Sequence, residues 1–145
     1  MASVSTYLNF PRNTEAAFEF YRSVFGGEFT GGIRRFGDMP AAPGQPPLAE
    51  ADRQLVMHVA LPILGCHVLM GTDAPESMGF AVNPGNNMYI NLEPDTRAEA
   101  DRLFNALAAG GKVGMPLADM FWGAYFGSLT DRFGVQWMFN CDSKT

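Results

Sequence analysis

The sequence predicts an α+β protein made of two βαβββ modules, whose curved mixed sheets carry their helices on the outside. The first observation behind this prediction is the order of the patterns, because each opening strand is followed by an amphipathic helix and then by further strands. The second observation is that this order occurs twice. The third is the composition of the 145 residues, 47% hydrophobic and 12% aromatic, which is enough to form a core.

The first module opens with an alternating strand over Val4–Phe10. A helix is predicted next over Glu15–Phe25, because its apolar residues recur at helical spacing and form a stripe on one side. Asn13 or Thr14 can cap it. Gly26-Gly27 ends this helix, because glycine readily takes the left-handed conformation that closes many helices.

Three more strands complete the first module, over Glu28–Phe36, Gln54–Pro62 and Gly65–Asp73. The last two form an antiparallel hairpin whose turn is Ile63-Leu64. Between the first two lies Gly37–Arg53. It is rich in proline, alanine and acidic residues, and its apolar residues recur at neither helical nor strand spacing. We expect a mobile excursion at the edge of the protein, either functional or simply disordered.

A loop over Ala74–Gly85 separates the modules, which span about 1–74 and 85–145 of a single domain, 1–145. The second module is predicted to hold a strand over Asn87–Leu92, a helix over Arg97–Ala109 and a strand over Lys112–Asp119. A hairpin within Phe121–Asn140 closes the chain. Its turn is Asp131-Arg132-Phe133-Gly134, because glycine supplies the positive φ and aspartate can bond the turn backbone.

The repeat is visible in the residues themselves. Tyr7-Leu8-Asn9-Phe10 recurs as Tyr89-Ile90-Asn91-Leu92, and the Gly-Gly pair that ends the first helix recurs as Gly110-Gly111. A single module would leave half a sheet with an open edge, and pairing two copies remedies this. Duplication of one module therefore explains the pattern better than chance.

Charge and composition exclude several classes of protein. The formal net charge is −5 and lysine and arginine form no cluster, so nucleic-acid binding is not expected. No apolar run reaches about 18 residues, so no membrane span is expected. The N-terminus lacks the pattern of a signal peptide. Cys66 and Cys141 are expected to be reduced thiols in the core rather than a disulfide, which favours a cytoplasmic protein.

Two βαβββ units in a chain of this length resemble the vicinal oxygen chelate superfamily, which includes glyoxalase I, bleomycin-resistance proteins and extradiol dioxygenases. Within it, the sequence is similar to the PhnB-like group, sometimes labelled 3-demethylubiquinone methyltransferase-like. The resemblance covers nearly the whole chain. The residues that carry it are Tyr7-Leu8-Asn9-Phe10, Phe20-Tyr21, Val24-Phe25-Gly26-Gly27, Met57-His58, Phe121-Trp122-Gly123-Ala124 and Asp131-Arg132-Phe133-Gly134-Val135-Gln136-Trp137-Met138.

Strand parity predicts which side chains share a face, because successive side chains point to opposite sides. A symmetric hairpin would pair Ala60 with His67 and bring His67 diagonal to His58. The resemblance implies that the face away from the helices is the binding site. The residues predicted on it are Tyr7, Asn9, His58, His67, Tyr89, Asn91, Gln136 and Met138. Trp122, beside Gly123, is predicted either to cover the mouth of a pocket or to lie in the core or a subunit interface.

The resemblance also implies where a metal would bind. Metal enzymes of the superfamily usually carry a glutamate four residues after the hairpin glycine, and here those positions are Met138 and Leu69. Neither side chain is a ligand for a hard divalent cation, so no metal and no cofactor are predicted. His58 and His67 could form a different site near Asp73, or be hydrogen-bonded pocket histidines. His58 is the best candidate for a general base, and Cys66 is expected to face the core.

The predicted function is that of a metal-independent protein that binds a small, partly apolar molecule, as antibiotic-sequestering members of the resembling superfamily do. The alternative is a metal-dependent enzyme of glyoxalase, dioxygenase or isomerase type with an atypical site around His58. The sequence does not decide whether the protein is catalytic. Since such modules often pair between chains, a homodimer is expected.

Overall fold

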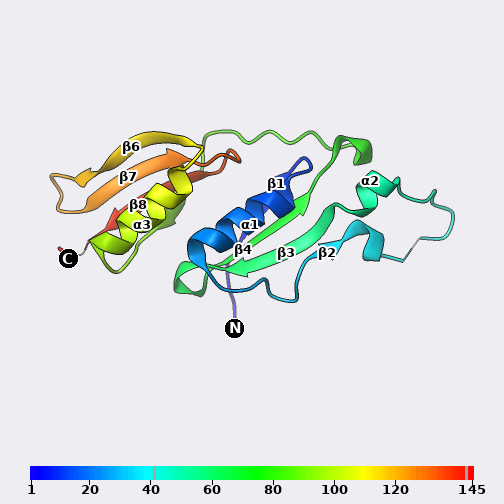
Figure 1. Ribbon diagram of the computed structural model, residues 1–145, viewed down its shortest axis with the longest axis horizontal. Coiled ribbons are helices and arrows are strands. Elements are labelled where there is room, and N and C mark those ends of the chain that lie inside the picture. The colour runs from blue at the N-terminus through cyan, green and yellow to red at the C-terminus, as the bar shows by residue number, and fades with distance from the viewer. Residues whose placement is uncertain (41, 143) are drawn as a thin grey trace. The chain divides into compact units, whose positions relative to one another are not determined.

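A computed structural model describes residues 1–40, 42–142 and 144–145. The chain divides into two compact units, Met1–Val82 and Asn83–Thr145, and the division falls inside the predicted inter-module loop. Each unit contains a four-stranded mixed sheet and a long helix (Figure 1). The predicted α+β fold of two repeated modules is therefore confirmed. Within the described residues, no helix is long and apolar enough to cross a membrane.

The first unit carries its sheet in the strand order β1-β4-β3-β2. The β1–β4 pair is parallel and the β3–β4 and β2–β3 pairs are antiparallel. Helix α1 packs on β3 and β4 through an apolar stripe that includes Phe18 and Tyr21, both fully buried. The elements of this unit are β1 Thr6–Phe10, α1 Thr14–Phe25, β2 Arg34–Arg35, α2 Glu50–Arg53, β3 Val56–Pro62 and β4 Val68–Asp73.

Asp73, at the end of β4, fixes the start of α1. The sequence suggested Asn13 or Thr14 as the cap of this helix, but neither side chain caps it. Instead, Oδ1 of Asp73 accepts hydrogen bonds from the backbone N–H of Thr14 at 3.0 Å and from its hydroxyl at 2.7 Å. Oδ2 of Asp73 accepts from the backbone N–H of Val56 at 2.8 Å. One buried carboxylate thus joins a helix and two strands.

Gly71 lies in β4 directly beneath helix α1. Replacing Gly71 with alanine is expected to destabilise the protein by about 1–3 kcal/mol, the usual cost of overfilling a core. The added Cβ would lie 2.4 Å from Cε1 of Phe18, whose ring is fully buried and cannot move into solvent. Urea unfolding followed by circular dichroism measures the loss. Adding Phe18→Leu should recover part of it, and an unchanged midpoint for Gly71→Ala would contradict the prediction.

The predicted strand over Glu28–Phe36 is much shorter in the structure. The N–H of Thr30 donates to the carbonyl of Ala60 in β3 at 2.9 Å, but Gly31 and Gly32 then take positive φ angles and turn the chain, so that only Arg34 and Arg35 form a strand beside β3. The register also shifts between the two arginines, as in a β-bulge.

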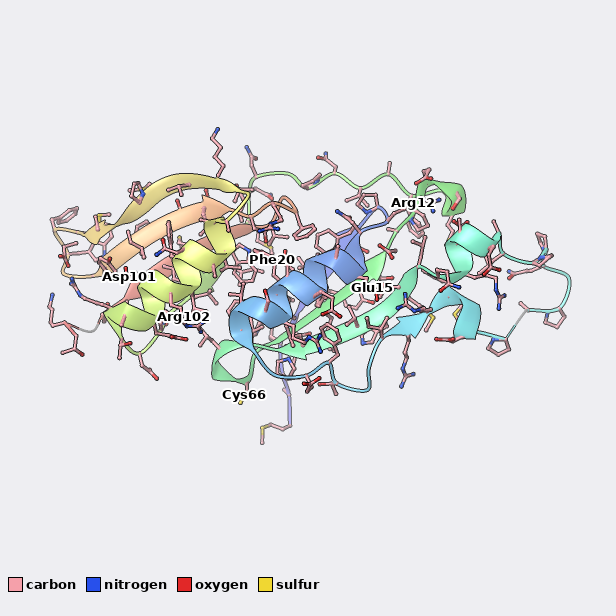
Figure 2. All side chains as sticks on the ribbon, viewed as in Figure 1. Arg12, Glu15, Phe20, Cys66, Asp101 and Arg102 are labelled. Carbon is pink, nitrogen blue, oxygen red and sulfur yellow. The ribbon has the colours of Figure 1, made fainter. Side chains whose placement is uncertain are left out.

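The loop predicted over 37–53 is tied down at both ends. Ala41, in its middle, lies outside the described residues. A 3₁₀ turn over Phe36–Asp38 begins the loop and α2 ends it. Arg12 donates to Asp52 in α2 at 3.1 Å and to Glu76 at 3.0 Å, which joins the loop to two other loops (Figure 2). The expectation of a mobile excursion is therefore wrong for the buried Asp52 and its helix.

Arg35 binds helix α1 through Glu15, and this ion pair is expected to make stability depend on pH. Arg35 donates to both carboxylate oxygens of Glu15, at 3.0 and 2.8 Å (Figure 2). The hydrogen bond to Arg35 lowers the pKa of Glu15 below its ordinary value of 4.5. A carboxylate with a lowered pKa stabilises the fold above its unfolded pKa, and this contribution is lost as the pH falls through the folded pKa.

Glu15→Gln is therefore expected to reduce the free energy of unfolding at about pH 7 by less than about 1 kcal/mol, because the pair is partly exposed. The difference from the wild type should shrink towards zero as the pH falls well below 4.5. Urea unfolding at several pH values measures it, with Glu93→Gln at another exposed carboxylate as the matched control. A difference that stays constant in acid would contradict the prediction.

The second unit carries its sheet in the corresponding order β5-β8-β7-β6. Helix α3 covers one side, and its apolar residues Ala100, Leu103, Phe104 and Leu107 are all buried. Thr96 caps α3 by accepting a hydrogen bond from the backbone N–H of Glu99 at 3.2 Å. The elements are β5 Ile90–Leu92, α3 Arg97–Ala108, β6 Lys112–Asp119, β7 Tyr125–Thr130 and β8 Gln136–Cys141.

The predicted closing hairpin is confirmed, with strands β7 and β8 joined by the turn over 131–134. Gly134 has a φ of 90°, and its N–H donates to the carbonyl of Asp131 at 3.0 Å. The Asp131 side chain is buried and accepts from the backbone N–H of Phe133 and from the indole N–H of Trp137, both at 2.8 Å. Asp131 thus holds the turn and the largest buried side chain of the core together.

Candidate functional site

The side of each sheet opposite its helix is called here the open face, and strand pairing fixes which residues lie on it. In the first unit, Tyr7 pairs with Met70 and Asn9 pairs with Thr72, while Ala60 pairs with Met70. Paired residues share a side of the sheet. The open face of the first unit therefore holds Tyr7, Asn9, Arg34, His58, Ala60, Pro62, Val68, Met70 and Thr72.

Tyr7 and His58 are in direct contact on this face. The Tyr7 hydroxyl lies 3.3 Å from Nδ1 of His58, and the two ring centroids are 5.9 Å apart. Tyr7 is 49% exposed and His58 is half-buried, so both can be reached from solvent. The structure thus brings together two of the site residues predicted from the sequence, from strands β1 and β3.

His67 does not join them, and the predicted pairing of Ala60 with His67 is wrong. Ala60 pairs with Met70, because a short turn over Leu64–Cys66 takes up residues that the symmetric hairpin would have placed in the strand. His67 therefore has the parity of Leu69, towards the helix side. Its Nε2 lies 2.9 Å from the hydroxyl of Thr6, a neighbour of Tyr7 that points the other way.

Cys66 also departs from its prediction. It was expected in the core, but it lies exposed on the turn between β3 and β4 (Figure 2). Gly65 and Cys66 have φ angles of 64° and 62°, which lift the turn out of the strand and break the parity on which the prediction relied. Cys141 is buried, as predicted.

The sequence predicted that Leu69 is the equivalent of Met138 in the first unit, and the same turn makes this prediction wrong. Leu69 is fully buried on the helix side, so it cannot correspond to Met138, which is half-buried on the other side of its sheet. Asn9 pairs with Thr72 just as Asn91 pairs with Met138. Thr72 therefore takes the place of Met138 in the first unit, and its hydroxyl already donates to the carbonyl of Val56 at 3.3 Å.

The open face of the second unit contains three of the remaining predicted residues, Asn91, Gln136 and Met138, whereas Tyr89 lies just before β5 and is 45% exposed. Asn91 pairs with Met138, and Met138 pairs with Ser128 on β7. Gln136 shares this side, and its amide donates to the carbonyl of Met88 at 2.7 Å, beside Tyr89. The strand predicted over Asn87–Leu92 begins only at Ile90, so Met88 lies before the strand and is 60% exposed. By strand pairing, the residues on this face are Asn91, Lys112, Met115, Ala118, Phe126, Ser128, Thr130, Gln136, Met138 and Asn140.

Trp122 lies at the edge of this face. It is 54% exposed and packs edge-on against Phe126, with ring centroids 5.9 Å apart. Phe126 pairs with Asn140, which places it on the same side as Met138. Gly123, with a φ of 97°, forms the tight turn that holds Trp122 out of the core. Of the three places predicted for Trp122, the core is therefore excluded within this unit.

Arg34 is an open-face residue that the sequence reasoning missed. It pairs with His58, and its neighbour Arg35 points to the helix side, where it binds Glu15. Because the register shifts between Arg34 and Arg35, the two arginines do not follow the regular alternation of a strand, and no signal in the sequence placed Arg34 on this face.

The resemblance described above implies a divalent metal ligand at one position on each open face. The equivalent positions hold the thioether of Met138 and the hydroxyl of Thr72, and their neighbours are the side-chain amides of Asn91 and Asn9. These are poor ligands for a hard cation. Among the described residues, no group of three or more histidine, cysteine, aspartate or glutamate side chains lies close enough to hold a metal ion.

Comparison with known proteins gives a consistent result. The family model of the glyoxalase/bleomycin resistance protein/dioxygenase superfamily matches residues 6–139. Protein YjdN of Escherichia coli strain K12 is 32% identical over 142 residues, which cover 94% of this chain and 93% of that protein. The crystal structure of protein PA1353 from Pseudomonas aeruginosa superposes with a TM-score of 0.81 at 39% identity, covering 98% of both chains. The PhnB protein from Bacillus cereus gives 0.72 at 28% identity, covering 97% and 99%.

Proposed function

We propose that this chain, which belongs to the glyoxalase/bleomycin resistance protein/dioxygenase superfamily, binds a small, partly apolar molecule on its open sheet faces without the help of a divalent metal. The observation that carries the proposal is the composition of the second unit's open face. Trp122, Phe126 and Met138 supply apolar surface there, next to neutral hydrogen-bonding groups. This mixture is typical of small-molecule sites, in which a few polar groups orient a ligand held by apolar contact.

The neutral polar groups are available for a ligand in suitable positions. Asn91 is exposed beside Met138, and Ser128 is half-buried on the other side of Met138. A side-chain amide both donates and accepts, so Asn91 can meet either kind of ligand group. Met138 is unbranched and polarisable, which suits a surface that adapts to the shape of its ligand.

Trp122 provides a direct test, because the chain has two tryptophans and the other, Trp137, is fully buried. A ligand on this face is expected to change the emission of Trp122 in a saturable way when a library of small aromatic compounds is screened. The change should disappear in Trp122→Phe, and Asn91→Ala should weaken binding about tenfold, as expected for the loss of one well-placed hydrogen bond.

Phe121→Ala is the matched control, because Phe121 is 98% exposed on the same turn and contacts the edge of Trp122. It should leave the affinity for the ligand nearly unchanged. A screen in which no compound gives a saturable signal, or one in which Asn91→Ala binds as well as the wild type, would contradict the proposal.

The alternative, a metal-dependent enzyme of glyoxalase, dioxygenase or isomerase type centred on His58, makes a different prediction. Protein purified without a chelator would then contain one divalent metal per chain, and His58→Gln would lose it. The proposed binding protein is expected to carry less than about a tenth of that amount, because its open faces offer so few suitable ligands. Elemental analysis of the wild type and the variant separates the two functions.

A homodimer is part of the same proposal. Strand β6 is a sheet edge that pairs with β7 alone, and its side chains Val113 and Met115 are 42% and 46% exposed. An apolar edge of this kind is a suitable surface for a second copy of the chain. Light scattering coupled to size-exclusion chromatography is expected to give twice the monomer mass. Val113→Lys, which lies on the side of β6 away from the proposed ligand face, should shift the protein towards the monomer.

A further inference from the structure

Arg34 differs from the other arginines in the hydrogen bonds and ion pairs that its side chain forms. Each of the other seven donates to a carboxylate or to a backbone carbonyl within its own unit. Within the part of the chain that the structure describes, Arg34 makes no such bond, and its residue is exposed. A guanidinium group with five donors is therefore available on the open face of the first unit.

The surroundings of Arg34 strengthen this observation. His58 is its direct partner across the β2–β3 pair, and the Tyr7 hydroxyl contacts His58 at 3.3 Å. Directly opposed residues in an antiparallel pair have Cβ atoms about 4.5–5.5 Å apart, well within the reach of an arginine. The described residues of this open face include no aspartate or glutamate, although the chain contains 15 acidic and 10 basic residues.

We propose that Arg34 and His58, with the His58 ring held in place by Tyr7, bind the oxyanion group, either a carboxylate or a phosphate, of a small molecule on the open face of the first unit. This inference rests on the proposed function and names the charge of the ligand. The planar fork of Arg34 can donate two parallel hydrogen bonds to two oxygens of such a group. When the Tyr7 hydroxyl donates to Nδ1 of His58, the neutral ring carries its proton on Nε2, which becomes a further donor for the anion.

The two faces therefore differ in the ligand chemistry they favour. The open face of the first unit brings Arg34 next to the His58 ring, whereas that of the second offers aromatic surface and neutral amides around Met138, with Lys112 on its edge strand β6. Because Arg34 and His58 would both donate to the same group, while the Tyr7 hydroxyl donates to His58, a neutral analogue of the same shape should bind much less well than the anion.

Titration with benzoate, with benzamide as its neutral counterpart and with inorganic phosphate tests the inference. The ring-proton NMR signal of His58 reports binding, and His67, which contacts Thr6 on the other side, is the internal reference. At constant ionic strength, benzoate or phosphate is expected to shift the His58 signal in a saturable way, while benzamide leaves it in place. A response to benzoate alone identifies a carboxylate ligand, and a response to phosphate alone identifies a phosphate ligand.

Arg34→Gln is expected to weaken anion binding about tenfold, the effect of losing one charge-assisted hydrogen bond of about 1.4 kcal/mol. Arg22→Gln makes the same change in net charge on helix α1, where Arg22 pairs with Glu19, and should bind like the wild type. Circular dichroism checks that both variants are folded.

Equal responses to benzoate and benzamide, no response of His58 to any probe, or equal losses in Arg34→Gln and Arg22→Gln would overturn the inference. These failures are distinguishable from a failure of the proposed function, because the Trp122 screen detects neutral ligands on the other unit. If the Trp122 screen finds a ligand but no anion shifts the His58 signal, the proposed binding function stands and the inferred anion site is wrong.

Discussion

Replacing Asp73 with alanine is expected to destabilise the first unit by about 4 kcal/mol. The carboxylate is buried and accepts two hydrogen bonds from Thr14 and one from the backbone of Val56. Hydrogen bonds to a charged group contribute about 1.5–3 kcal/mol each, and the alanine variant would leave all three buried donors without an acceptor. The sum is reduced because the three bonds act as one group.

Urea unfolding followed by circular dichroism measures this loss. Asp73→Asn is the matched variant: its carbonyl can still accept from Thr14, but its NH₂ group would meet the N–H of Val56, so an intermediate loss is expected. A wild-type midpoint in Asp73→Ala would show that the carboxylate does not hold α1 and β3 in place.

The same experiment tests whether residues 1–145 behave as a single domain, as the sequence predicts. Both tryptophans belong to the second unit, so their emission follows the unfolding of that unit only. If the two units unfold together, the fluorescence transition of Asp73→Ala should shift as far as the circular dichroism transition. If they unfold separately, the fluorescence transition should stay where it is in the wild type.

Replacing Asp131 with alanine is expected to cost about 3–5 kcal/mol, in the second unit. Its carboxylate accepts hydrogen bonds from the backbone of Phe133 and Val135 and from the indole of Trp137. Loss of the carboxylate would leave the buried indole N–H without this acceptor and would free the turn that sets the register of β7 and β8.

A double-mutant cycle with Trp137→Phe separates the two effects. If the bond to the indole is important, the loss in the double variant should be smaller than the sum of the two single losses by about 1–3 kcal/mol. The coupling is measured by urea unfolding with circular dichroism. Additive losses would indicate that Asp131 acts on the turn alone.

The sequence predicted most of the fold because the signals were local. The stripe of α3, the Gly-Gly stops and the turn at Gly134 each depend on a few neighbouring residues, and the structure contains all of them. Asp73 shows the limit of this approach. It is 59 residues from Thr14 in the chain, so no local pattern could identify it as the group that caps α1.

The open-face residues were predicted well where parity could be followed through a regular strand. Tyr7, Asn9 and His58 lie on one face as expected, and Asn91, Gln136 and Met138 lie on another. The errors arise at turns. Positive φ angles at Gly65 and Cys66 moved His67, Leu69 and Cys66 away from their expected positions, and a cysteine with positive φ cannot be foreseen from the sequence.

The segment over 39–49 leaves and rejoins the first unit at nearly the same point. The N–H of Phe36 donates to the carbonyl of Leu55 at 3.0 Å, and the Arg53 side chain donates to the carbonyl of Gly37 at 3.3 Å. The ends of the excursion are thus closed by the fold itself, whatever its length. Doubling a flexible loop costs only about 0.6 kcal/mol of closure entropy. This segment is therefore a natural place to insert an affinity tag, a fluorescent label or a small reporter domain.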